Sequence, residues 1–196
     1  MTVQVPKISL LIETERLILE PVTEGHAQTM VNVLNDPKLY SFIPFDPPSL
    51  EKLKQRYKRW EARISPEQNE IWLNWVIHLK STDQYIGDLQ VGYKENKEAS
   101  IAYMIAENWQ GQGYATEGLV SLIYMLFDCL DMTCVKAWID TRNQKSINLV
   151  KTMGFQHTDT LIKADHFKDQ DSDEFVFELH SRDWPQLCNK PPYSVI

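Results

Sequence analysis

A glycine-containing turn in the middle of the chain has the clearest capacity for chemistry. Residues 109–117 (WQGQGYATE) lie between a predicted strand and the most amphipathic segment of the chain. The first turn of a helix has free N–H groups and the positive end of the helix dipole, so it is a natural seat for a phosphate or pyrophosphate. Glycine lets the backbone approach such a group without an obstructing Cβ. The residues that we expect to contact the anion are Gln110, Gly111, Gln112, Gly113, Tyr114, Ala115 and Thr116.

Three interpretations of this turn compete. It is a plain turn without a ligand, a dinucleotide-binding turn, or a loop for the pyrophosphate of coenzyme A. The dinucleotide pattern needs a third glycine where this chain has Thr116, and only one strand–helix–strand unit surrounds the turn. Both departures disfavour the dinucleotide interpretation.

The residues around the turn favour the coenzyme A interpretation. Residues 110–115 (QGQGYA) match the pattern Q/R-x-x-G-x-G/A, and here the chain resembles the GNAT acetyltransferase superfamily. Three further stretches look like the branch that acetylates the N-termini of ribosomal proteins. They are residues 101–118 (IAYMIAENWQGQGYATEG), residues 13–19 (ETERLIL), and Asn143-x-x-Ser146 followed by residues 153–155 (MGF). The resemblance covers roughly residues 12–182.

The resemblance implies a fold and a cosubstrate. The fold is of the α/β (α+β) class: one domain with a mixed, mostly antiparallel sheet, splayed between its fourth and fifth strands and flanked by about four helices. The cosubstrate is acetyl-coenzyme A, whose pantetheine arm pairs with the open edge of the fourth strand. In this chain that edge is Met104, Ile105 and Ala106, and Asn143 and Ser146 complete the cofactor site. A strand N–H would polarise the acetyl carbonyl.

The chemistry of acetyl transfer to an amine directs attention to Ser146. The amine must be neutral to attack, and the departing thiolate takes up a proton. The resemblance implies that Ser146 protonates the thiolate or bonds the cofactor. The alternative is a serine in the first helical turn that bonds its own backbone. The tyrosine that many family members carry one helical turn later is replaced by Val150.

Two carboxylates are further catalytic candidates. Asp165 lies in the predicted loop 164–173, where related N-terminal acetyltransferases carry a carboxylate, and His166 stands beside it. Glu98 begins the predicted fourth strand and would hold a water near the amine. The alternatives are a surface acidic loop and a charge at a hairpin edge. Glu117 reads as structural, because a carboxylate in the first helical turn favours the dipole.

The elements that must position these residues follow the order β-α-α-β-β-β-α-β-α-β-β. We expect Thr23, Ser49 and Asn143 to cap helices and Gly154 to end the last one in a left-handed conformation. The proline-rich residues 41–48 read as a loop, and Gly87 as the site of a bulge. In that loop and before it, aromatic residues either wall the acceptor pocket or fill the surface: Tyr40, Phe42 and Phe45.

Length and charge limit the function. The 196 residues predict one domain, residues 1–184, with a loosely attached tail, residues 185–196. A formal net charge of −7 disfavours nucleic acid as a partner and weakly favours a cationic one. Neither a signal peptide nor a membrane span is visible, which indicates the cytoplasm. Five scattered histidines and three cysteines without CxxC spacing predict no metal site, and Cys129 and Cys134 read as buried thiols.

Taken together, these residues predict an N-acetyltransferase in which the amine attacks acetyl-coenzyme A directly. The expected acceptor is a peptide or protein α-amine. The alternatives are a small cation, such as a polyamine or an aminoglycoside, and a non-catalytic coenzyme A-binding module. The oligomeric state stays open, a homodimer included.

Overall fold

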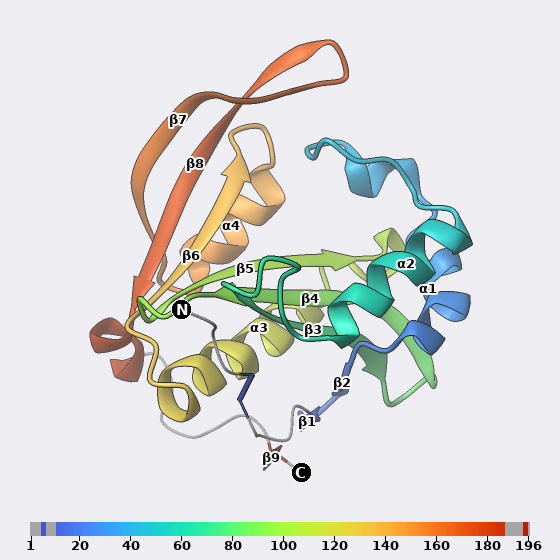
Figure 1. Ribbon diagram of the computed structural model, residues 1–196. Helices are drawn as coiled ribbons and strands as arrows, with labels where there is room; N and C mark the ends of the chain where they lie inside the picture. Colours follow the sequence, from blue (N-terminus) through green and yellow to red (C-terminus); the bar gives the residue numbers. More distant parts are fainter. Residues whose placement is uncertain (1–4, 7–10, 187–193, 196) are drawn as a thin grey trace.

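The centre of the protein is a nine-stranded sheet in the order β7-β8-β6-β5-β4-β3-β2-β1-β9 (Figure 1). The structure, a computed structural model, describes residues 5–6, 11–186 and 194–195. Neighbouring strands are antiparallel except for β5 and β6, which are parallel. The strands are β1 (Ile12–Glu13), β2 (Leu17–Pro21), β3 (Ile71–Leu79), β4 (Gln84–Tyr93), β5 (Glu98–Ile105), β6 (Cys134–Asp140), β7 (Gln156–Phe167), β8 (Gln170–His180) and β9 (Ser194–Val195).

Helices cover both faces of the sheet, and their number agrees with the flanking helices that the resemblance implies. The described residues contain four α-helices: α1 (Ala27–Val33), α2 (Leu50–Glu61), α3 (Tyr114–Tyr124) and α4 (Gln144–Thr152). Short 3-10 turns are η1 (Glu24–His26), η2 (Pro37–Tyr40), η3 (Glu107–Trp109) and η5 (Ser181–Gln186), and α3 runs on into a π-helical turn, η4 (Met125–Cys129). None of the described helices is long and apolar enough to cross a membrane.

Two apolar cores hold the layers together. The larger lies between the sheet and the α3–α4 layer, where Leu89, Leu119 and Val150 are completely buried. The smaller lies between the sheet and the α1–α2 layer, where Met30 and Leu53 are completely buried. Burying a side chain of this size contributes about 1.5–3 kcal/mol, so these faces supply most of the stabilisation. The sheet is therefore the central layer, with a separate helical layer on each side.

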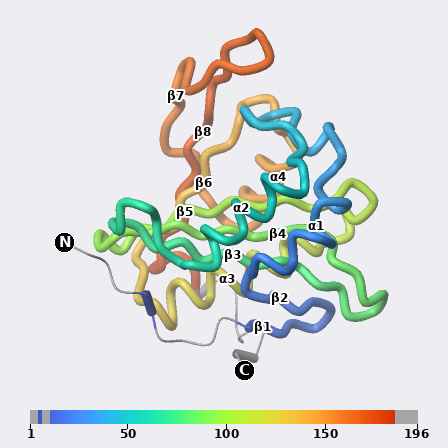
Figure 2. The backbone as a smooth tube through the Cα atoms, turned by 45° about the vertical axis from the view of Figure 1, so that its right-hand side comes forward, coloured from blue at the N-terminus to red at the C-terminus, as the bar shows by residue number. Residues whose placement is uncertain are grey.

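The sheet opens where the resemblance predicts. Strands β5 and β6 pair only from Glu98–Ser100 to Cys134–Lys136. Beyond Ser100 the two strands diverge, and α4 lies in the opening (Figures 1 and 2). The predicted fold is confirmed. The diverging strands were expected as the fourth and fifth, and they carry the labels β5 and β6 because β1 is a separate short strand.

The predicted helix ends are also confirmed. Ser49 Oγ accepts the N–H of Lys52 at 3.4 Å, and Asn143 Oδ1 accepts the N–H of Ser146 at 3.2 Å. Thr23 begins η1 rather than α1, and its N–H donates to Nδ1 of His26. Gly154 follows α4 with a φ of 91°. The sheet register shifts at Ile77/His78, opposite the segment that holds Gly87, so the predicted bulge is present.

Two local predictions of secondary structure differ from the structure. The acidic residues 164–173 do not form a loop: β7 extends to Phe167 and β8 begins at Gln170. Lys168 and Asp169 alone make the turn, with φ angles of 52° and 59°. Positive φ at both positions is typical of a two-residue hairpin turn. The sequence did not indicate this hairpin, because charged residues at its exposed tip resemble a loop. The predicted strand 14–20 begins only at Leu17.

The cysteines and the C-terminal residues agree only in part with the prediction. Cys134 is buried as expected, but Cys129, which lies in the π-helical turn after α3, is exposed. Cys188 and most of the predicted tail lie outside the described residues. Of residues 185–196, Ser194 and Val195 pair with β1, so the chain end adds the outermost strand of the sheet.

Candidate active site

The predicted anion-binding turn has the backbone that it needs. Gly111 and Gly113 have φ angles of 74° and 83°, a region that side chains with a Cβ rarely adopt. The first backbone bond of α3 runs from the N–H of Glu117 to the carbonyl of Gly113 at 3.0 Å. The helix therefore leaves the N–H groups of residues 114–116 without helical acceptors. Because residues 111–113 are exposed, these donors lie at an accessible surface.

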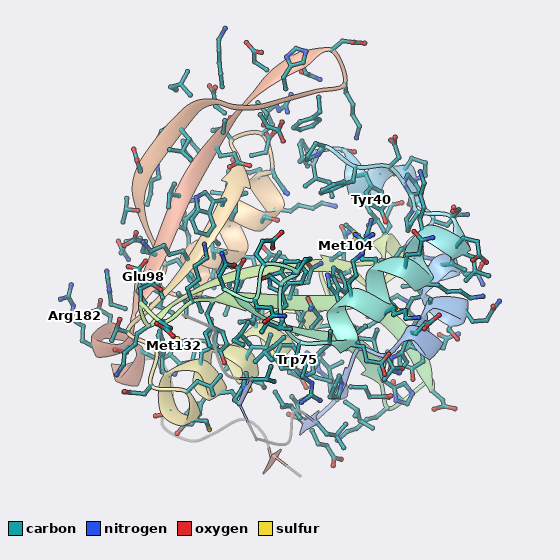
Figure 3. The ribbon with its side chains drawn as sticks, in the orientation of Figure 1. Tyr40, Trp75, Glu98, Met104, Met132 and Arg182 are labelled. Atoms are coloured by element: carbon teal, nitrogen blue, oxygen red, sulfur yellow. The ribbon has the colours of Figure 1, made fainter. Side chains whose placement is uncertain are left out.

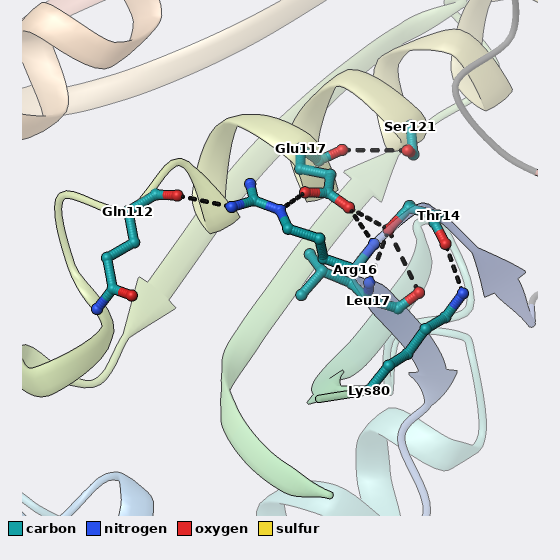
Figure 4. A network of polar contacts seen from close by, with 7 residues as sticks. All are labelled: Thr14, Arg16, Leu17, Lys80, Gln112, Glu117 and Ser121. Carbon is teal, nitrogen blue, oxygen red and sulfur yellow. Dashed lines mark hydrogen bonds and ion pairs between the residues drawn. The ribbon is translucent and has the colours of Figure 1, made fainter. Parts of the chain in front are cut away.

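A partly buried ion pair fixes the turn against the segment between β1 and β2 (Figure 4). Arg16 Nε lies 2.6 Å from Glu117 Oε2, and Arg16 Nη1 donates to the carbonyl of Gln112 at 3.0 Å. Glu117 Oε1 also accepts the hydroxyl of Thr14 at 2.6 Å. Burial alone would raise the pKa of Glu117, but the hydrogen bonds and the Arg16 charge outweigh it and lower that pKa. Glu117 is structural, as expected.

The side chain of Gln110 bridges the two sides of the opening. Its Nε2 donates to the carbonyl of Ile105 at 2.9 Å, and its Oε1 accepts Lys145 Nζ of α4 at 3.0 Å. Gln110 thus ties the end of β5 to the first turn of α4. The sequence did not single out Lys145, which adds a positive charge beside the turn. The position of Lys145 within the N-x-x-S motif could have indicated that it lies near the site.

The edge of β5 that faces the opening is narrower than predicted. The N–H of Ala106 donates to the carbonyl of Ile86 in β4 at 2.9 Å, so it is not free. Because backbone groups of an antiparallel strand alternate in direction, Met104 also bonds toward β4 while Ile105 points toward the opening. The carbonyl of Ile105 already accepts Gln110. Its N–H is therefore the backbone donor that this geometry directs at a ligand.

Ser146 and Tyr103 face one another across the same opening. Asn143 holds the backbone of Ser146, which leaves the serine hydroxyl for other partners. The phenol oxygen of Tyr103 is buried and has no hydrogen bond of normal geometry. Burial raises the pKa of Tyr103, and the nearby Ser146 side chain opposes the rise. Val150 is completely buried, so the site has its phenol on β5 rather than on α4.

The two carboxylates singled out from the sequence lie on different strands, β5 and β7. Glu98 stands at the end of β5 opposite to Met104, and Figure 3 labels both residues. Its Oε2 lies 3.2 Å from Lys136 Nζ and accepts Asn96 Nδ2 at 3.0 Å. Asp165 lies on β7, and its Oδ1 accepts the N–H of His166 at 2.7 Å. The structure does not bring Glu98 and Asp165 together.

The aromatic residues expected near the acceptor differ in exposure, and His166 does not pair with Asp165. Tyr40 is buried, and its hydroxyl donates to the carbonyl of Leu34 at 3.0 Å. Phe42 is partly buried, whereas Phe45 is 58% exposed. His166 Nδ1 pairs with Asp171 at 2.8 Å rather than with the Asp165 carboxylate.

The tip of the β7–β8 hairpin reaches the α1–α2 side of the molecule. Lys168 Nζ donates to the backbone carbonyl of Tyr40. Figure 1 shows this hairpin arching from the β6 side toward the segment that follows α1. The contact ties the tip of the hairpin to the segment between α1 and α2.

A buried carboxylate that the sequence reasoning missed lies on the opposite face of the sheet from Ser146. Asp88 of β4 is 3% exposed and stands between Val76 of β3 and Met104 of β5 in the cross-strand register. Its signal was present: Asp88 and Gln90 interrupt a strand whose other positions are mostly apolar or glycine.

Two further clusters lie away from the opening. Cys134, Glu178 and His180 offer donor atoms within 4.8 Å of one another, a grouping from two strands that spacing could not reveal. Lys136 Nζ already lies 3.3 Å from Glu178, and burial raises the pKa of Cys134 to about 11, so the cluster holds an ammonium and a protonated thiol. A cleft of about 630 Å³ lies between α1 and η3 and meets the predicted cofactor residues only at Ala106.

Comparison with known proteins identifies the class of this fold and site. A sequence model of the acetyltransferase (GNAT) domain matches residues 16–156, which is more than half of the chain. The protein belongs to the GNAT acetyltransferase family, and it is an acyltransferase. Acetyl-coenzyme A is the acetyl donor of this family, and the free N–H groups of residues 114–116, the open space at Gly111 and the unpaired edge of β5 fit its pyrophosphate and pantetheine.

Individual relatives agree with this assignment. The chain is 26% identical over 177 residues to a Bacillus licheniformis protein named uncharacterized N-acetyltransferase p20, covering 87% of this chain and 96% of that protein. A ribosomal-protein-serine acetyltransferase-like structure from Vibrio cholerae matches with a TM-score of 0.72 at 20% identity, over 90% of this chain and 99% of the other. A chimera of a Vibrio cholerae spermidine N-acetyltransferase matches with a TM-score of 0.69 at 19% identity, over 88% and 99%.

Proposed function

We propose that the protein transfers the acetyl group of acetyl-coenzyme A to a primary amine by direct attack, and that the acceptor is the α-amine of a peptide or protein. The observation that carries the proposal is the open edge of β5 leading into the glycine turn of α3. Pairing with β6 stops at Ser100, and residues 114–116 keep free N–H groups at the end of the same path. The open edge of β5 offers backbone groups to the amides of such a ligand, and the accessible N–H groups at the start of α3 offer donors to its phosphates.

The groups around the opening divide the chemistry among them. The N–H of Ile105 is directed toward the acetyl carbonyl and stabilises negative charge on its oxygen. Ser146, with the Tyr103 phenol beside it, is placed to return a proton to the departing thiolate. Neither group forms a bond to the acetyl carbon, so the amine nitrogen takes the acetyl group in a single transfer.

One observation favours an alternative acceptor, a small cation in place of a peptide α-amine. Burial raises the pKa of Glu174, and the negative charges of Asp165 and Asp140, which both act on it, raise this pKa further. Negative charge on the β6–β8 side of the opening favours a small cation, such as a polyamine or an aminoglycoside. In this setting Asp165 attracts the acceptor or takes its proton. The family relatives include named enzymes of both acceptor types.

Release of free thiol from acetyl-coenzyme A tests the proposal. The panel contains spermidine, an aminoglycoside, and short peptides that begin with alanine or serine. For each peptide, the same peptide with a blocked N-terminus is the control. We expect thiol release above background with an unblocked peptide and none with its blocked form. Faster thiol release with spermidine than with the peptides would instead assign a small cation as the acceptor. Tight coenzyme A binding without thiol release for any amine would favour a binding module instead.

A further inference from the structure

A polar group is embedded in the α1–α2 core at the edge of the active-site opening. Val76, Asp88 and Met104 form one row across β3, β4 and β5, and Val76 and Met104 belong to the smaller apolar core. The next row toward the start of β5 ends at Ala102, which is exposed, and Met104 is only partly buried. The Asp88 carboxylate therefore lies under the border between the helical layer and the open face of β5.

The surroundings of Asp88 contain hydrogen-bonding capacity that the protein itself does not use. Gln90 Nε2 donates to Asp88 Oδ1 at 3.0 Å, the one hydrogen bond that described residues give this carboxylate. Tyr57 of α2 is completely buried, and its hydroxyl has no partner. Asn74, opposite Gln90 in the register, is 7% exposed and its Nδ2 has no partner. Buried polar groups normally find partners, so two unpartnered groups beside a carboxylate that accepts a single hydrogen bond indicate a ligand.

The electrostatics of this place favour a cation. Burial raises the pKa of Asp88 to about 6, although the Gln90 hydrogen bond and the charge of Arg56 oppose the rise. The ionisable groups that interact with Asp88 are Arg56 and Tyr57 of α2 and Tyr40 of η2. Arg56 gives no hydrogen bond to Asp88 within the described residues. A buried carboxylate without a bonded cation is costly, and cost of this kind concentrates at functional sites.

We propose that Asp88, with Tyr57 and Asn74, forms the subsite for the primary ammonium group of the acceptor, and that Asp88 takes the proton whose loss makes the amine nucleophilic. The inference rests on the proposed function, since it assigns the acceptor side of that site. The position of Asp88 in the sheet suits this role. Asp88 of β4 lies opposite Met104 of β5, and Met104 directly precedes Ile105, whose N–H faces the opening.

The proton balance of the transfer is simple. The ammonium gives one proton to the Asp88 carboxylate, and the neutral nitrogen forms a bond to the acetyl carbon. The carbon–sulfur bond breaks, the nitrogen loses its second proton, and the thiolate takes one proton. One proton is released overall, and Asp88 returns to its ionised form by passing its proton to solvent.

The first test measures folding stability and needs no turnover. Since the folded pKa of Asp88 lies above its ordinary value of 3.8, the folded protein holds a proton between these values that the unfolded chain releases. Ionised Asp88 therefore destabilises the fold above about pH 6. Asp88→Asn should raise the melting temperature at about pH 8 and give no gain at about pH 4. Equal melting temperatures, or a lower one for the variant at the higher pH, would overturn the assignment of a strained carboxylate.

The second test measures acceptor binding directly. The probe is n-butylammonium, titrated by calorimetry into the protein with bound coenzyme A, for the wild type, Asp88→Asn and Asp128→Asn. Asp128 is exposed on η4 and serves as a control for the loss of one negative charge. We expect Asp88→Asn to weaken binding by more than about tenfold, and Asp128→Asn to leave it unchanged. Equal affinity in Asp88→Asn, or no binding to the wild type, would overturn the proposal.

These outcomes separate the subsite from the proposed function. If the wild type acetylates an amine and Asp88→Asn does so at the same rate, the function stands and the subsite is wrong. If n-butylammonium binds in an Asp88-dependent way but no amine is acetylated, the subsite stands and the proposed transfer fails.

Discussion

Ser146 has two separable roles, because its backbone and its hydroxyl serve different partners. The backbone N–H completes the cap with Asn143, and this bond survives removal of the side-chain oxygen. The hydroxyl faces the buried phenol of Tyr103 in the opening between β5 and β6. The sequence pointed to Ser146 through its motif. It could not show Tyr103, because that contact depends on the divergence of two strands.

Removing the Ser146 hydroxyl should therefore affect chemistry more than folding. We expect Ser146→Ala to lower turnover by a factor in the range of about 10²–10⁴, typical of a general acid, with coenzyme A affinity little changed. Steady-state kinetics and calorimetry measure the two effects. Asn143→Ala is the matched control, since it removes the cap but keeps the hydroxyl. Turnover within about twofold of wild type would reduce Ser146 to a helix-capping residue.

At the scale of elements, the first turn of α3 depends on a residue far away in the chain. Glu117 receives hydrogen bonds from Thr14 and Arg16, and Arg16 also holds the carbonyl of Gln112. The sequence indicated the helix start and a structural Glu117, because dipole and propensity are local properties. The Arg16 partner is about a hundred residues away, and no local pattern could reveal it.

Loss of the Glu117 charge should destabilise the protein in a pH-dependent way. Glu117→Gln leaves the half-buried Arg16 without its anion, which costs about 1–3 kcal/mol of unfolding free energy near neutral pH. Because the folded pKa of Glu117 is lowered, its contribution is present above the unfolded pKa of 4.5 and is lost as the pH falls through the folded value. Denaturant unfolding at several pH values measures this difference.

The control for this variant is a carboxylate in an exposed pair. Glu107 and Lys38 form an ion pair at 3.0 Å with exposed fractions of 46% and 72%. Glu107→Gln should change the unfolding free energy by less than about 1 kcal/mol. If both variants gave the same small change, the Arg16–Glu117 ion pair would not be what holds the turn.

The glycine turn gives a second prediction at this scale. A Cβ at Gly113 would lie 3.3 Å from Arg16 Nη2, on a backbone with a φ of 83°. Gly113→Glu adds bulk and negative charge where phosphates are expected, so it should abolish measurable coenzyme A binding in calorimetry. Gly154→Glu makes the same change at a φ of 91° after α4 and serves as the control. Unchanged affinity in the Gly113 variant would show that the phosphates bind elsewhere.

At the scale of the whole molecule, function follows from a sheet that is continuous at one end and open at the other. Sequence pattern and family resemblance together predicted this fold, its flanking helices and the turn at α3. They missed the length of the β7–β8 hairpin, because charged residues on an exposed ribbon look like a loop. They also missed Asp88, because burial of a single carboxylate is decided by helices that pack over it from other parts of the chain.

The most direct measurement of the central claim is the mass of the acceptor after incubation with acetyl-coenzyme A. The acceptor is the panel amine that gives the fastest thiol release, and the protein is compared with its Gly113→Glu variant. The account predicts one acetyl group on the amine nitrogen for each thiol released, with wild-type protein alone. Thiol released without an acetylated amine, or equal acetylation by the variant, would contradict it.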